Sequence, residues 1–339
     1  MKKHANIPVF IPHLGCPNQC VFCNQRTISG VKEFDVESVK QIIDTALETI
    51  PDSTLCEIAF FGGSFTGIDR DLMVQLLTIA HSYVRSGRVS GIRCSTRPDY
   101  INKEILEILK AYGVKVIELG LQSSDDNVLK LTKRGHDFAA EKAACKLIKD
   151  YGFSLVGQMM IGLPGSTEKS EEETAEFIIS TGADAARIYP TVVFKDTELC
   201  EMAEMGLYEP LTNEDAVRRT AKVMKKFIDS DVEVIRVGLC SSENLSDGET
   251  YFSGPNHPAI GELVENEIFY EHIKEKINEA GPGNINSLTV LVPKGALSKA
   301  VGQNKKNKSR LLREYSLTNI KFIENDLVTE YDVSIVKEG

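Results

Sequence analysis

The sequence lacks the features of a membrane-bound or secreted protein. No apolar run approaches the roughly 20 residues that a membrane-spanning helix needs. The N-terminus begins with basic residues but leads directly into a strand-like segment that contains Pro8 and Pro12, with no apolar signal-peptide core. We therefore expect a cytoplasmic protein with no membrane segment.

Positive charge is also scarce over the chain as a whole. Its 39 Lys and Arg residues stand against 49 Asp and Glu residues, which gives a formal net charge of −10 at pH 7. This balance argues against nucleic-acid binding by the whole surface, so any such role requires a local basic patch. With 339 residues, of which 42% are apolar, the chain can form one large domain and a smaller second one.

Disulfides are not expected among the eight cysteines, because the cytoplasm keeps thiols reduced. Five cysteines lie singly in apolar patterns, where a small buried side chain is the simplest interpretation. These five are Cys56, Cys94, Cys145, Cys200 and Cys240. The other three, Cys16, Cys20 and Cys23, follow the first strand-like segment at the spacing C-x3-C-x2-C.

Strand-like and helix-like segments alternate from Asn6 to about Leu239. Six such repeats in series predict parallel βαβ units, which favour an α/β fold of the partial (β/α)6 barrel type. A doubly wound open sheet is the alternative architecture. The expected strands cover residues 7–14, 56–61, 91–96, 115–122, 154–161 and 185–194, with one further strand at 232–239.

The unusual residues of this region lie at or near the carboxyl ends of the expected strands. In chain order they are the three clustered cysteines, Gly62 and Gly63, Ser95 and Arg97, Gln122, the segment 162–165, and Tyr189. Because parallel strands end at the same rim, and α/β barrels and sheets build their sites there, we expect these residues to form one site.

The cysteine loop has the spacing of an iron–sulfur ligand set. Thiolates at Cys16, Cys20 and Cys23 fit three corners of a 4Fe–4S cubane. Three ligands leave one iron open, as at metal sites that do chemistry on a bound ligand. A zinc site is the alternative, with His13 as the local candidate for a fourth ligand.

With these motifs the chain resembles the radical S-adenosylmethionine (SAM) superfamily, and within it the catalytic subunit of Elongator and its bacterial and archaeal relatives. Oxygen-independent coproporphyrinogen oxidases share several of the motifs. The stretches that carry the resemblance are Gly15–Cys23, Phe61–Phe65, Ser95–Tyr100, Glu118–Ser124, Lys133–His136, Gly162–Gly165 and Arg187–Thr191.

The resemblance implies a mechanism and its cofactors. The open iron chelates the amino and carboxylate groups of SAM, and an electron from the reduced cluster cleaves the sulfonium to give methionine and a 5′-deoxyadenosyl radical. An electron donor such as flavodoxin or ferredoxin is implied as a partner. The residues that the resemblance suggests for cofactor binding are Phe22, Gly62, Gly63, Ser64, Ser95, Gln122, Arg134 and Gln158.

Individual residue types fit these roles. Gly62 and Gly63 let the backbone approach the methionine amine, and the fork of donors on Arg134 suits the carboxylate. Ser95 and Gln158 stand where coproporphyrinogen oxidases carry acids, which argues against a porphyrin substrate. Tyr189 and Thr191 are the candidates for catalytic contact with the substrate.

Residues 241–339 are expected to form a separate small α+β domain after a core of residues 1–240. Between Lys294 and Tyr315 there are seven basic residues against one acid, Glu314. The seven are Lys294, Lys299, Lys305, Lys306, Lys308, Arg310 and Arg313. The segment 301–307 resembles the Gly-x-x-Gly loop of KH domains, with Lys305 in place of the second glycine. We expect this patch to bind RNA, and an exposed, solubilising helix is the alternative.

The first functional hypothesis is therefore a radical SAM enzyme that modifies RNA, with tRNA as partner. A radical enzyme acting on a small molecule or tetrapyrrole is the second, and a non-catalytic haem carrier is the third. The Elongator subunit continues into an acetyltransferase domain for which this sequence has no room, so we do not expect its carboxymethylation chemistry to carry over.

Overall fold

The computed structural model describes residues 4–11, 16, 20–24, 34–239, 250–281 and 286–338. The chain divides into two compact units, which are described separately. The first consists of Met1–Leu211 and Lys226–Asn256, and the second of Thr212–Lys225 and His257–Gly339. The domain boundary expected after residue 240 differs from this division. In particular, residues 212–225 group with the second unit through long-range contacts that the pattern along the chain does not indicate.

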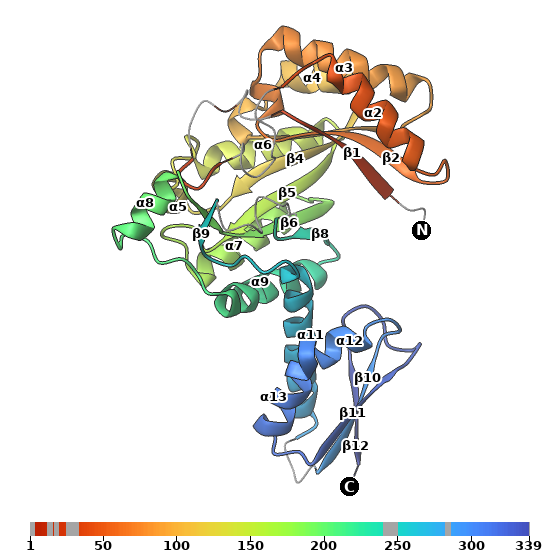
Figure 1. Cartoon of the computed structure of the whole chain (residues 1–339), viewed down its shortest axis with the longest axis vertical. Helices are drawn as coiled ribbons and strands as arrows, with labels where there is room; N and C mark the ends of the chain where they lie inside the picture. The colour runs from red at the N-terminus through yellow and green to blue at the C-terminus, as the bar shows by residue number, and fades with distance from the viewer. Residues whose placement is uncertain are drawn as a thin grey trace. The chain divides into compact units, whose positions relative to one another are not determined.

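Seven parallel strands form the main sheet of the first unit, and they are ordered β1-β2-β3-β4-β5-β6-β8 (Figure 1). Their bounds are β1 His4–Phe10, β2 Leu55–Phe61, β3 Gly91–Thr96, β4 Val114–Gln122, β5 Ser154–Ile161, β6 Ala185–Pro190 and β8 Glu233–Val237. A doubly wound sheet requires a reversal of strand order, and this order has none. The sheet curls into a half-barrel, which confirms the predicted α/β partial barrel.

The strand expected over residues 185–194 is shorter in the structure. Strand β6 ends at Pro190, and the last backbone hydrogen bond to β5 is donated by the amide of Thr191 to the carbonyl of Ile161 (2.8 Å). The next residues form a separate strand, β7 (Val193–Phe194), which pairs antiparallel with β9 (Tyr251–Ser253).

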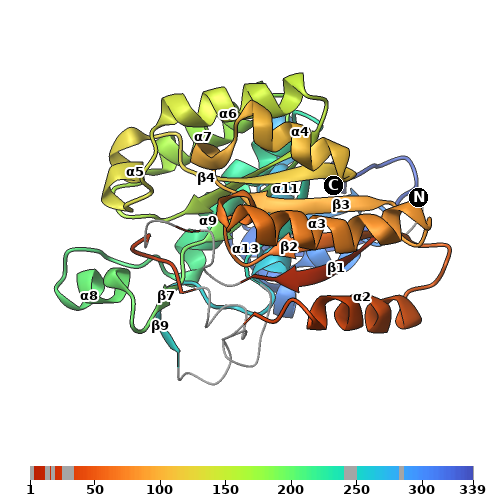
Figure 2. The ribbon, with the colours of Figure 1, turned by 90° about the horizontal axis from the view of Figure 1, so that it is seen from above.

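Helices cover the outer face of the half-barrel (Figure 2). The covering helices are α2 Ser38–Thr49, α3 Arg70–Arg85, α4 Lys103–Ala111, α6 Phe138–Asp150 and α7 Glu168–Ser180. The shorter helices α5 Asp126–Leu131 and α8 Glu198–Glu204 and the 3-10 helices η1 Phe65–Gly67 and η2 Pro98–Tyr100 lie in the connections that follow strands. Most begin where the sequence provides a side chain that accepts a hydrogen bond from a first-turn amide, as Asp69 does for α3 and Asp137 for α6. Helix starts are therefore encoded locally.

Side chains alternate between the two faces of each strand. The face toward the helices is apolar and fully buried, as Phe60 and Ile117 illustrate. Gly157 also faces this side, because a Cβ there would lie 2.6 Å from the Ile178 side chain of α7. The opposite, concave face carries charged residues, and it is the face on which the candidate site is built.

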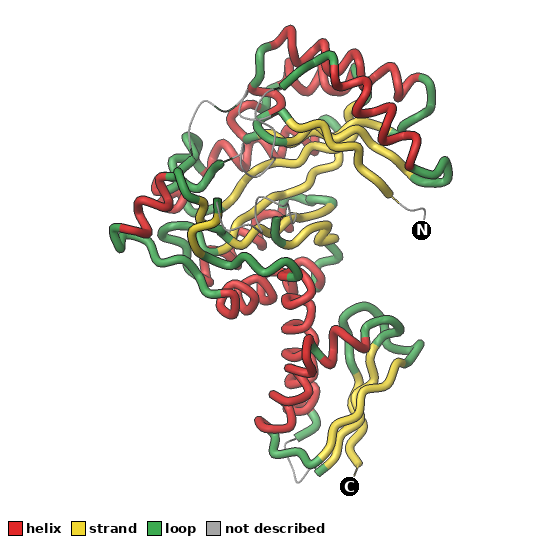
Figure 3. The backbone as a smooth tube through the Cα atoms, in the orientation of Figure 1, coloured by secondary structure: helices red, strands yellow, loops and turns green. Residues whose placement is uncertain are grey.

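The second unit is a small α+β unit with a core of its own (Figure 3). Its elements are α11 Ile260–Glu279, β10 Ser287–Val292, α12 Leu297–Val301, the 3-10 turn η3 Gln303–Lys305, α13 Lys306–Glu314, β11 Asn319–Glu324 and β12 Ser334–Glu338, together with most of α9 Asn213–Ile228. Strand β10 lies between a parallel neighbour, β11, and an antiparallel one, β12. Within the described ranges no helix is both long and apolar enough to cross a membrane.

Candidate functional site

The described part of the cysteine loop is tied to two helices. The amide of Val21 donates to the carbonyl of Thr132 at the end of α5 (3.2 Å), and the amide of Leu199 in α8 donates to the carbonyl of Val21 (2.8 Å). Cys20 is buried, whereas Cys16 and Cys23 are half-buried. His13, the candidate zinc ligand, lies outside the described residues, as does Cys240.

Two buried arginines face Cys20. Nη1 of Arg134 lies 3.4 Å from the Sγ of Cys20, and Nη1 of Arg97 lies 3.9 Å from the same atom. Burial raises the pKa of the Cys16 thiol, while a hydrogen bond from the Ser64 backbone and the charges of Arg97 and Arg134 act in the opposite direction. The site therefore combines thiols with cations that can form charge-assisted hydrogen bonds to thiolate sulfur.

Gln122 and Arg134 each carry an unpaired buried atom. Gln122 ends β4 with a left-handed φ of 74° and is only 5% exposed. Its Oε1 and the Nε of Arg134 have no hydrogen-bond partner in the described part of the chain. The two side chains lie close together, because a Cβ on Gly120 would come within 3.0 Å of Gln122 Nε2 and 3.4 Å of Arg134 Nη2. Unpaired buried polar atoms are costly, so this pair fits a polar ligand such as SAM.

Three other predicted cofactor contacts are engaged with protein atoms. The Ser64 hydroxyl is buried and hydrogen-bonded to the Thr96 hydroxyl (2.9 Å). The Ser95 hydroxyl lies 3.4 Å from the carbonyl oxygen of Gly63. The ring of Phe22 packs against the apolar cluster that contains Val21 and Leu199. Their contact with a cofactor stays a prediction.

The remaining predicted residues differ in their access to the concave face. Gln158 is half-buried and pairs in register with Arg187. Tyr189 is also half-buried, and its hydroxyl lies 3.4 Å from Nη1 of Arg187. Thr191 is 1% exposed, and its hydroxyl donates to the carbonyl of Ile161 (2.7 Å). Of the two substrate-contact candidates, Thr191 is thus fully buried, whereas Tyr189 is half-buried beside Arg187.

Gly62 has a structural reason to be glycine that the sequence does not reveal. Its φ is +98°, and a Cβ there would lie 3.1 Å from the backbone nitrogen of Ile11 on the neighbouring strand end. The constraint thus comes from strand β1 as well as from the predicted approach of SAM.

We expect Gly62→Ala to lower the free energy of unfolding of the cofactor-free protein by about 2 kcal/mol, from left-handed strain plus the close contact. Gly87→Ala is the control, since Gly87 also has a positive φ (+74°) but a Cβ there meets nothing within 4 Å. The control measures the backbone cost alone, about 1 kcal/mol in urea denaturation. Equal losses for both variants would show that the contact with Ile11 contributes nothing.

A ladder of buried ion pairs crosses the concave face, and the sequence analysis does not identify it. Arg93 of β3 bonds Glu57 of β2 through Nη2 (2.6 Å) and Glu118 of β4 through Nη1 (2.8 Å). Glu118 also pairs with Arg187 of β6, whose Nε lies 2.7 Å from Oε2. The available signal was a single charged residue in the middle of an otherwise apolar strand, which is rare unless the charge is paired.

Comparison with known proteins identifies the family. The family model described as the Radical SAM superfamily matches residues 10–178, and the Radical SAM C-terminal domain matches residues 183–269. The chain belongs to the radical SAM superfamily. As a radical SAM enzyme it uses a 4Fe–4S cluster and SAM, as the resemblance implied.

Relatives of this radical SAM chain include an uncharacterized protein of Methanocaldococcus jannaschii, 34% identical over 62% of this chain and 68% of that one. The tRNA uridine(34) acetyltransferase of Methanocaldococcus infernus is 38% identical over 38% of this chain, but the match covers only 25% of that protein. The solved structure of the archaeal Elp3 of M. infernus shares the fold, with a TM-score of 0.63, 22% identity and coverage of 81% of this chain and 64% of that one. The resemblance to the Elongator radical SAM core is confirmed.

The residue types of the candidate site can be compared with what a cluster needs. Across the described segments, no three His, Cys, Asp or Glu side chains converge to hold a single metal ion. A cubane binds each thiolate at a different iron, so its ligands need not converge on one point. The donor set consists of the loop thiols, the guanidinium groups of Arg97 and Arg134 near Cys20, and the unpaired polar atoms of Gln122 and Arg134, and its chemistry suits a cluster with SAM beside it.

Proposed function

We propose that Cys16, Cys20 and Cys23 hold the 4Fe–4S cluster of this radical SAM enzyme, and that the enzyme cleaves SAM to modify RNA, tRNA in particular. The observation that carries the proposal is the position of Arg134. It contacts Cys20 with one nitrogen and the carbonyl of Gly120 with another (2.6 Å), while its Nε remains unpaired. A guanidinium so fixed supports a role in binding a carboxylate next to the cysteine loop.

Each residue of the site has a definite task in this proposal. The cluster, when bound, supplies the electron for SAM cleavage. Arg134 holds the methionine carboxylate, and the free oxygen of Gln122 accepts a hydrogen bond from the nucleoside. Tyr189 presents its hydroxyl toward the substrate from the concave face.

The RNA part of the proposal is supported by a relative named for tRNA and by the second unit. Three of the seven basic residues in its patch are paired with acids: Lys299 with Glu265, Lys306 with Glu214 and Arg310 with Glu267. The patch is therefore smaller than its composition indicates. Lys294, Lys305, Lys308 and Arg313 have no ion pair with any described residue.

The turn that resembles a KH loop is tightly built. Gly302 has a φ of +78°, and a Cβ there would lie 2.9 Å from the backbone nitrogen of Asn307. Asn304 and Lys305 are also left-handed, so the chain reverses sharply between α12 and α13. Lys305 is exposed on this turn and Lys308 follows one turn later. Such a rigid turn with adjacent cations suits an RNA backbone.

We expect the double variant Lys305→Glu/Lys308→Glu to bind total tRNA at least about 10-fold more weakly at low salt, with a salt dependence reduced by about two phosphate contacts. The control is Lys142→Glu/Lys146→Glu on α6 of the first unit, which makes the same change of charge. Filter binding between about 50 and 200 mM salt gives both numbers. Equal weakening in both variants would remove the patch from the proposal.

The reaction itself is tested by anaerobic reconstitution. The protein is loaded with iron and sulfide, reduced and assayed for 5′-deoxyadenosine with and without total tRNA. The proposal expects SAM cleavage that tRNA stimulates. Cleavage without response to tRNA would favour a small-molecule or tetrapyrrole substrate, and a haem spectrum without cleavage would favour the carrier.

A further inference from the structure

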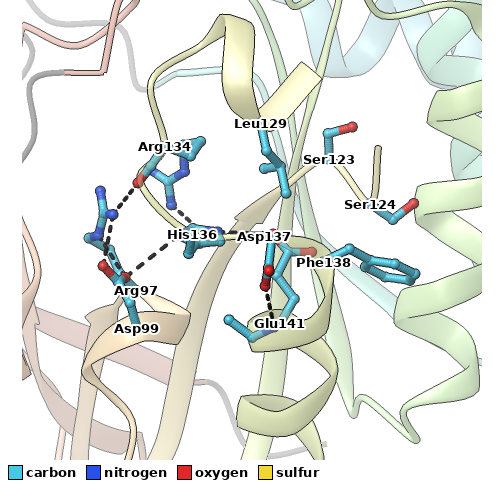
Figure 4. A network of polar contacts seen from close by, with 12 residues as sticks. Arg97, Asp99, Ser123, Ser124, Leu129, Arg134, His136, Asp137, Phe138 and Glu141 are labelled. Carbon is cyan, nitrogen blue, oxygen red and sulfur yellow. Dashed lines mark hydrogen bonds and ion pairs between the residues drawn. The ribbon is translucent and has the colours of Figure 1, made fainter. Parts of the chain in front are cut away.

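Two ionisable side chains lie deep behind the arginines of the site (Figure 4). The side chain of His136 is 1% exposed and that of Glu141, in α6, is 0% exposed. Nε2 of His136 lies 3.1 Å from Oε1 of Glu141. On the other side of the ring, Nδ1 lies 3.6 Å from Oδ1 of Asp99 in η2, which is an ion-pair contact longer than a hydrogen bond.

Asp99 in turn holds Arg97 in a two-point contact. Nε and Nη2 of Arg97 donate to the two carboxylate oxygens of Asp99 at 2.9 and 3.0 Å. Nη2 of Arg97 also donates to the carbonyl of Arg134, and its Nη1 faces Cys20. A continuous chain of charged and polar groups therefore runs from Glu141 through His136 and Asp99 to Arg97 (Figure 4), and Nη1 of Arg97 extends it to Cys20.

Burying these charged groups is unfavourable for the free energy of folding. Burial would raise the pKa of the Asp99 carboxyl, but the interactions with His136 and Arg97 hold it well below its usual range. Burial raises the pKa of Glu141 to about 7, although His136 opposes the rise. Buried ion pairs contribute little net stability compared with apolar packing, whereas they fix geometry well. The chain of contacts is thus better explained by positioning than by stability.

We propose that His136, held by Glu141, positions Asp99 and through it the guanidinium of Arg97 against Cys20, and that Arg97 thereby raises the reduction potential of the cluster. The inference rests on the proposed function, because it requires Cys20 to be a cluster ligand. A cation beside a ligand sulfur stabilises the added electron, and net charge and hydrogen bonds to sulfur set cluster potentials. Asp99, His136 and Glu141 are positioning residues, which act only through Arg97.

The sign of the effect of Asp99→Asn separates positioning from simple electrostatics. If Asp99 contributed only its charge, removing a negative charge near the cluster would raise the potential. If Asp99 positions Arg97, the variant releases the guanidinium and the potential falls. We expect a fall, measured by redox titration of the cluster signal in electron paramagnetic resonance. A rise, or no change, would overturn the proposal.

His136 offers a matched pair of variants. An Asn amide can take the place of Nδ1 and keep the contact with Asp99, whereas a Gln amide takes the place of Nε2 and keeps only the contact with Glu141. His136→Asn should therefore retain the wild-type potential of the cluster. His136→Gln should lower this potential, and Arg97→Gln should lower it as well. If both His136 variants change the reduction potential equally, His136 has only a packing role and the proposal is wrong.

The double variant Arg97→Gln/His136→Gln shows whether His136 acts on the cluster through Arg97. We expect no further shift beyond that of Arg97→Gln alone, since the two changes remove the same interaction. Shifts of the reduction potential that add up would show that His136 acts independently of Arg97, and would overturn the proposal. Iron and sulfide content is measured first in every variant. If the wild-type protein binds no cluster, the proposed function is refuted. If every variant binds a normal cluster with the same reduction potential as the wild type, only this inference is refuted.

Discussion

Cys20→Ala is expected to abolish cluster binding and to reduce 5′-deoxyadenosine formation to background. Cys20 is the buried thiol of the loop, and both guanidinium groups of the site face its sulfur. With it removed, the cubane would retain two of its three ligands, and two buried cations would lose the anion they face. Iron and sulfide content, the visible spectrum of the reconstituted protein and product chromatography measure the loss.

The control for this variant is Cys145→Ala. Cys145 is also a buried free thiol, but it lies within α6, and burial raises its pKa to about 12, so it stays a protonated thiol. The control should keep the full cluster and full activity. A complete cluster in Cys20→Ala would show that the ligand set has been wrongly assigned.

Glu118→Gln is expected to lower the free energy of unfolding by about 3–5 kcal/mol, the usual cost of breaking a buried ion pair. Glu118 accepts a hydrogen bond from Arg93 on one side and forms an ion pair with Arg187 on the other. Its neutral amide would leave both buried guanidinium groups short of negative charge. Urea denaturation of the cofactor-free protein measures this cost separately from any effect on the cluster.

Glu104→Gln is the matched control, because Glu104 pairs with Arg70 at 2.6 Å but both side chains are exposed. Exposed pairs contribute at most about 1 kcal/mol, so the control should be nearly as stable as the wild type. A similar small loss in Glu118→Gln would mean that water reaches the concave face and screens the ladder. The ladder would then have little influence on the orientation of Arg187 and Tyr189.

Much of the fold could be predicted because its signals are local. Strand–helix alternation follows from the periodicity of apolar residues, and helices begin at capping side chains such as Asp69 and Asp137. The short spacing of the cysteines restricts them to one loop, whatever the rest of the chain does. These features depend on residues within a few positions of one another, so the sequence determined them.

Only the tertiary structure decided which distant side chains meet. Glu57, Arg93, Glu118 and Arg187 come from four strands, and no local pattern shows that they pair across the concave face. The same holds for the division of the chain, in which residues 212–225 join the second unit. It also holds for the basic patch, where acids far away in the sequence neutralise three of the seven cations.

The same distinction between local sequence and tertiary structure applies to the candidate site. The sequence determined the residue types at the strand ends, because parallel strands of one alternating pattern must share a rim. The tertiary structure determined their chemistry: it left Gln122 and Arg134 with unpaired atoms, occupied the hydroxyls of Ser64 and Thr191, and placed Arg97 against Cys20. Hydrogen bonds and ion pairs depend on a few tenths of an ångström between residues far apart in the chain, and only the packed fold sets those distances.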